Sequence, residues 1–179
     1  MMRSKLLAGK SVLMIIARQA FRDEELAVPR SVLKDAGATI TIASRGTQES
    51  VGMLRQVRVK PDVTLDKVDP KAYDAVVFIG GSGASEYFDY LPARQVAVQA
   101  FEAGKVVAAI CIAPAILANA GVLKGKKAAC FTSVKDALMR GGARLSTAPV
   151  ERDGQVITAD GPQSARAFGE AILDALAGK

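Results

Sequence analysis

The sequence predicts an α/β fold built on a mostly parallel β-sheet, because buried strands and helices alternate along the chain. Three continuous apolar runs are typical of strands that are buried on both faces of a sheet: residues 11–17, 75–79 and 106–110. Three helical patterns follow them and end at glycines, which often terminate helices: residues 23–36, 91–103 and 113–120.

The remaining elements extend this architecture. Residues 39–43 are a predicted second strand, and residues 128–131 are a later one. Asp153-Gly154 separates two β-branched stretches, a pattern that predicts a β-hairpin. Residues 164–177 are expected to close the fold as a helix.

Composition excludes several kinds of site and partner. The chain has no histidine, so it contains neither a Ser-His-Asp triad nor an imidazole metal ligand. Its formal net charge is +6, but the basic residues are scattered without an aromatic-rich motif, so we expect no nucleic-acid partner. No linker divides residues 1–179, which we expect to form a single domain, since domains commonly contain about 100–200 residues.

Two further patterns bear on compartment and membrane. Cys111 and Cys130 form no CxxC pair, so we expect no disulfide framework and no metal site, and we assign the chain to the reducing cytoplasm. Residues 106–123 carry no charge and approach the length of a membrane span. Pro114 interrupts this stretch, and a buried strand followed by a buried helix explains it better, so no membrane contact is expected.

Cys111 is the first candidate for chemistry. In parallel sheets ligands bind beyond the carboxyl ends of the strands, where residues 17–25, 80–86 and 111–114 should meet. Cys111 lies between a predicted strand and a predicted helix, a junction that turns sharply and projects the side chain outward. The helix N-terminus is expected to favour the thiolate. The alternative is an inert buried cysteine.

Glu25 and a glycine turn are the other candidates. Glu25 lies in the first turn of a predicted helix, four residues before Pro29, which cannot donate to its carbonyl. From the sequence alone, a role as one of three acids that complement the helix dipole is the simpler explanation. Gly80-Gly81 follows a predicted strand and suits either an oxyanion hole or a plain tight turn. It matches neither a Walker motif nor a dinucleotide fingerprint, so no cofactor is expected.

These motifs together resemble one known family. Ala109-Ile110-Cys111-Ile112-Ala113-Pro114, with Gly80-Gly81 and Glu25-Leu-Ala-Val-Pro29 before it, is similar to the ThiJ/PfpI superfamily, and the resemblance runs from about residue 11 to residue 179. It implies a flavodoxin-like three-layer sandwich with a mostly parallel central sheet and a nucleophile elbow. It also implies a homodimer.

The resemblance assigns roles by motif. Cys111 is similar to the elbow nucleophile of the family, and Glu25 matches the glutamate that hydrogen-bonds the thiol. The backbone N–H groups of Gly81 and Ile112 would form the oxyanion hole. Two further residues would line the cleft: Gly80 and Arg55.

Two departures from the family pattern affect the expected function. Ile112 replaces the histidine that follows the nucleophile in PfpI-type peptidases, and Phe131 stands where the deglycase branch has a histidine. The resemblance therefore implies a stress-protective protein that acts on small reactive carbonyl compounds, as a glyoxalase or deglycase, with cysteine oxidation as a sensing role. The alternatives are a non-catalytic redox sensor or chaperone-like protein, and a hydrolase of small amides or peptides.

Overall fold

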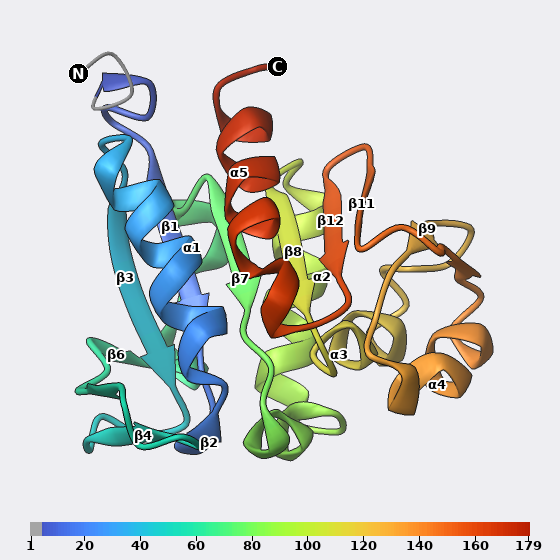
Figure 1. Cartoon of the computed structure of the whole chain (residues 1–179), viewed down its shortest axis with the longest axis horizontal. Helices are drawn as coiled ribbons and strands as arrows, with labels where there is room; N and C mark the ends of the chain where they lie inside the picture. Colours follow the sequence, from blue (N-terminus) through green and yellow to red (C-terminus); the bar gives the residue numbers. More distant parts are fainter. Residues whose placement is uncertain (1–4) are drawn as a thin grey trace.

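The computed structural model describes residues 5–179, and its centre is a seven-stranded sheet with the order β11-β12-β8-β7-β1-β3-β6 (Figure 1). All neighbours in the sheet run parallel except β11 and β12, which form the predicted hairpin. The sheet strands are β1 (Ser11–Ile15), β3 (Thr39–Ser44), β6 (Val63–Thr64), β7 (Ala75–Phe78), β8 (Val106–Ile110), β11 (Val150–Asp153) and β12 (Val156–Ala159).

Helices cover both faces of this sheet and make three layers. In Figure 1, α1 and α5 lie side by side in front of the sheet, and α2 lies behind it. Each face therefore has its own apolar core. The α-helices are α1 (Asp23–Asp35), α2 (Leu91–Glu102), α3 (Pro114–Asn119), α4 (Lys135–Arg140) and α5 (Ala165–Leu176). The predicted flavodoxin-like sandwich with a mostly parallel sheet is confirmed.

The two front helices approach each other closely at Pro29 and Gly169. A Cβ added to Gly169 would lie 2.9 Å from the Cα of Pro29, a distance that real side chains do not reach. Pro29 lies inside α1, and the glycine of α5 leaves the space for it. This contact fixes the position of α1, which carries Glu25.

Short elements beside the main sheet were not foreseen or were placed wrongly. Residues 128–131 are not a strand of the main sheet: β9 (Lys127–Ala128) pairs only with β10 (Arg144–Leu145), and Cys130 lies in the loop that follows. A second small sheet joins β2 (Gln19–Phe21), β4 (Ser50–Gly52) and β5 (Arg58–Val59). Strands of two or three residues carry too little hydrophobic pattern to be recognised. The short 3-10 helices are η2 (Leu65–Lys67), η3 (Pro70–Ala72), η4 (Ser82–Tyr87), η5 (Thr132–Val134) and η6 (Pro162–Ser164).

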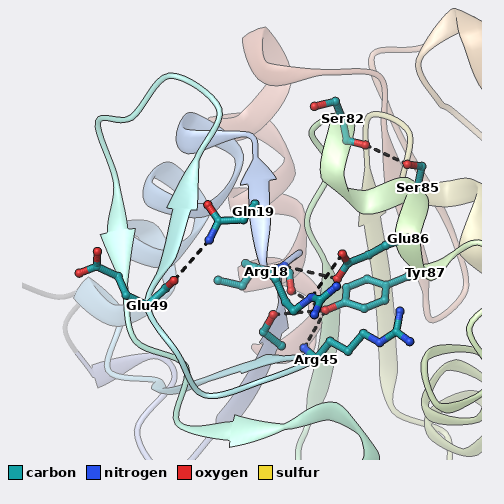
Figure 2. Close-up of polar contacts among 10 residues, drawn as sticks. Arg18, Gln19, Arg45, Glu49, Ser82, Ser85, Glu86 and Tyr87 are labelled. Atoms are coloured by element: carbon teal, nitrogen blue, oxygen red, sulfur yellow. Dashed lines mark hydrogen bonds and ion pairs between the residues drawn. The ribbon is translucent and has the colours of Figure 1, made fainter.

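Tyr87 ties the loops beyond the carboxyl ends of β1 and β3 together (Figure 2). Its buried hydroxyl donates to the carbonyl of Ile16 at 2.8 Å and accepts the N–H of Arg45 at 3.0 Å. Burial raises the pKa of this phenol, so it stays protonated and keeps donating at neutral pH. The rim of the sheet is therefore held firmly where chemistry is expected. Within residues 5–179 no helix has the length and apolar character needed to cross a membrane.

Candidate active site

Cys111 sits on a strained elbow between β8 and α3. Its φ is 65°, a left-handed value that costs a non-glycine residue about 1–3 kcal/mol. Its N–H donates to the carbonyl of Ala159 at 2.9 Å, and its carbonyl accepts the N–H of Phe131 at 2.8 Å. These bonds from both sides hold the turn, so the predicted elbow geometry is present. The side chain is 8% exposed.

Gly80 brings Glu25 and Cys111 together. A Cβ placed on Gly80 would lie 2.5 Å from Oε1 of Glu25 and 2.7 Å from Cβ of Cys111. Both side chains therefore fill the space that glycine leaves open. The N–H of Arg22 donates to the Gly80 carbonyl at 2.9 Å, which fixes the start of α1 against this turn. Glu25 is fully buried, and a carboxyl in that position faces the thiol rather than water.

Two backbone amides point at the same sulfur. The N–H groups of Gly81 and Ile112 both lower the pKa of the Cys111 thiol, as hydrogen-bond donors to sulfur do. Gly81 reaches this orientation with a φ of 101°, and a Cβ there would collide with the backbone of Ala20, Phe21 and Arg22. Two converging amides beside a nucleophile are the arrangement that stabilises an oxyanion.

The electrostatics of the pair contradict one expectation. Burial raises the pKa of Glu25 from 4.5 to about 7. Burial, and after it the charge of Glu25, raises the pKa of the Cys111 thiol to about 12, so the expected helix-lowered value is wrong. Because α3 has only six residues, its dipole does not overcome desolvation. At neutral pH the pair carries at most one negative charge, and the thiol ionises by passing its proton to Glu25.

Arg55 lies on a separate turn between β4 and β5. It has a φ of 58° and lines a cavity of about 300 Å³ with Ala20, a cavity that neither Cys111 nor Glu25 lines. Of the six predicted site residues, five therefore converge and Arg55 stands apart.

Asp23 is the residue that sequence reasoning missed. Only 1% exposed, it accepts the N–H groups of Leu54, Gln56 and Val57 at 2.8–2.9 Å, and so ties the β4–β5 turn to the start of α1. In spite of desolvation, these donors lower the pKa of its carboxyl. In the sequence Asp23 resembles an ordinary acidic residue in the first turn of a helix, because the turn that it binds is some thirty positions away.

Cys130 faces a different layer from Cys111. Cys130 packs into the core on the α2 side of the sheet, whereas Cys111 packs on the α1 side. Both are free thiols, and burial raises the pKa of Cys130 to about 11. No cluster of three or more metal-ligating side chains occurs among residues 5–179.

Comparison with known proteins identifies the family of this chain. The model of the DJ-1/PfpI family matches residues 10–175. Protein dj-1beta of Drosophila melanogaster is 34% identical over 96% of this chain and 91% of its own length, and the deglycase PH1704 of Pyrococcus horikoshii is 37% identical over 84% and 90%. The crystal structure of a ThiJ/PfpI domain protein from Brachyspira murdochii superposes with a TM-score of 0.92 at 27% identity, covering 94% of this chain and 97% of that one. The chain therefore belongs to the DJ-1/PfpI family.

Proposed function

We propose that this protein is a cysteine-dependent enzyme of the glyoxalase or deglycase type, which converts reactive 2-oxoaldehydes to 2-hydroxy acids. The observation that carries the proposal is the convergence of Cys111 and Glu25 on Gly80, beneath the amides of Gly81 and Ile112. Relatives named as deglycases, such as the deglycase PfpI of Pyrococcus furiosus at 33% identity, support the same class of activity.

Cys111, Glu25 and the two backbone amides each carry out part of the reaction. As the thiol of Cys111 passes its proton to Glu25, its sulfur adds to the aldehyde carbon, and the two amides hold the new oxyanion. Glu25 gives up that proton to the solvent or to the oxyanion, then removes the proton on the former aldehyde carbon. A proton returns to the neighbouring carbon, giving a thioester.

Water then cleaves the thioester, which releases the hydroxy acid and restores the thiol. The overall reaction adds one water. The aldehyde carbon is oxidised while the ketone carbon is reduced, so the step needs no outside oxidant. A carboxyl with a pKa of about 7 is well placed for both proton transfers, because it exchanges protons readily at neutral pH.

The test is turnover of methylglyoxal to lactate. We expect wild-type protein to form lactate and Cys111→Ala to form none above the uncatalysed rate, because no other nucleophile lies on the elbow. Leu91→Ala, a change at an exposed side chain of α2, is the control and should retain activity. Equal lactate formation by wild type and Cys111→Ala would rule the proposal out.

A second role is favoured by the raised pKa of Glu25. Two molecules of peroxide would take the thiol to a sulfinate, each giving up one oxygen and leaving water. A carboxyl that keeps its proton near neutral pH can donate a hydrogen bond to that sulfinate and stabilise it. We expect intact mass after limited peroxide to show a single gain of two oxygens, located on Cys111. Oxidation spread evenly over both cysteines would contradict a sensing role.

The proposal also covers the cellular compartment and the oligomeric state. Free thiols at Cys111 and Cys130 suit the reducing cytoplasm. Met53 and Leu54, both 41% exposed on the β4–β5 turn, offer an apolar patch for a second copy of the chain, so we propose a homodimer.

A further inference from the structure

A cavity of about 370 Å³ is lined by residues of the loops next to the elbow, although neither Cys111 nor Glu25 lines it. Cys111 is hydrogen-bonded through its carbonyl to Phe131 and through its N–H to Ala159. Phe131 lines the cavity, as does Asp160, the residue after Ala159. The cavity is therefore lined by one backbone partner of Cys111 and by the residue that follows the other, and its volume falls within the range of about 300–1,000 Å³ that is usual for small-molecule sites.

The lining of this cavity combines apolar and polar residues and includes an exposed aromatic ring. Phe131 leaves 44% of its surface exposed, in a chain with only six phenylalanines and no tryptophan. Ala129, Cys130 and Ala148 add apolar groups to the lining. Its polar residues are Thr132, Lys135, Ser146, Thr147, Asp160 and Gln163. An exposed aromatic ring is a surface that an apolar ligand group can cover.

We propose that this cavity holds the side group of the carbonyl substrate, and that Phe131 makes it selective for 2-oxoaldehydes that carry an aromatic group. The inference rests on the proposed function, because it assigns the substrate class of the same cysteine. A phenyl group attached to the carbonyl would pack against the ring of Phe131 while the aldehyde carbon meets Cys111. A methyl group offers no ring for that packing.

The size of the effect follows from ring packing. A well-placed aromatic pair should change kcat/KM by about two- to twelve-fold. Loss of the Phe131 ring should lower kcat/KM only for the substrate that carries an aromatic group. A loss common to both substrates would instead indicate a disturbed elbow.

The experiment compares phenylglyoxal, followed as mandelate, with methylglyoxal, followed as lactate. We expect Phe131→Ala to lower kcat/KM for phenylglyoxal by about two- to twelve-fold and to leave that for methylglyoxal within about two-fold. Phe131→Leu keeps an apolar side chain without the ring and should show the same selective loss. Leu91→Ala, which removes an apolar side chain that is 59% exposed on α2, is the matched control.

A second measurement does not depend on turnover. The rates at which N-phenylmaleimide and N-methylmaleimide label Cys111 are read by peptide mass spectrometry, which separates Cys111 from Cys130. We expect the phenyl-to-methyl ratio to fall in both Phe131 variants and to stay constant in Leu91→Ala. An unchanged ratio overturns the inference. Absence of turnover with both substrates, together with a ratio that falls, refutes the proposed function alone.

Discussion

Replacing Glu25 by glutamine should lower the turnover of methylglyoxal by about 10²–10⁴-fold, the usual contribution of a positioned acid–base group. Glutamine keeps the shape of the side chain but can neither accept the thiol proton nor remove the proton from the substrate carbon. The chain has no histidine that could substitute for it. Initial rates of lactate formation measure the effect, and Glu24→Gln, a change at a partly exposed acid paired with Arg22, is the matched control.

The same substitution should remove a pH dependence of the rate. Glu25 acts as a base only when ionised, so the rate of the wild type should rise with pH through about 7, the raised pKa of this carboxyl. The thiols titrate far higher, at about 12 and about 11, and cannot cause that rise. A wild-type profile that is flat between pH 5 and pH 9, or a Glu25→Gln variant with the wild-type profile, would contradict this role.

The stability of the wild type should fall as pH rises, whereas its rate should rise. The folded state binds the Glu25 proton more tightly than the unfolded state, whose carboxyl has its ordinary pKa of 4.5. Between pH 4.5 and 7 the unfolded chain gives up this proton first, so ionisation favours unfolding and stability falls as pH rises. Above pH 7, the free energy of unfolding of wild type should therefore be lower, relative to that of Glu25→Gln, by up to about 3 kcal/mol than it is at low pH. Urea unfolding of both proteins at pH 5 and pH 8 measures this difference.

Placing a methyl group on Gly80 should disable the site and destabilise the fold. The added Cβ would lie 2.5 Å from Oε1 of Glu25 and 2.7 Å from both Cβ of Cys111 and the carbonyl oxygen of Ile110. The last contact is with backbone, which cannot rotate away, so the β7 loop or the elbow must move. We expect a loss of about 1–3 kcal/mol in stability, typical of overpacking. A shift of about 1 Å between the reacting groups should cost about 100-fold in rate.

Gly46→Ala is the control for that experiment. A Cβ at Gly46 meets no atom within 4 Å, and the residue does not need a left-handed conformation. Its stability and rate should therefore match those of wild type. If Gly80→Ala also retains wild-type rates of lactate formation, Gly80 does not hold the two side chains together.

Much of the fold could be predicted from local sequence patterns. The continuous apolar runs of β7 and β8, and the glycine that ends α1, depend only on neighbouring residues, so they were predicted within one or two positions. The elbow at Cys111 followed from the same logic, because a strand that leads directly into a helix must turn sharply there. Glu25 and Gly81 were selected through the family resemblance rather than by local pattern, since each had an ordinary structural explanation.

Tertiary structure decided what those residues can do. The carboxyl of Glu25 lies next to Cys111 only because β7, β8 and α1 bring three distant segments to one glycine, and no local pattern records that proximity. Burial then raised the pKa of both groups, which reversed the expected ionisation of the thiol. The sequence determined which residues carry reactive atoms, but desolvation depends on everything packed around an atom, and only the folded chain supplies it.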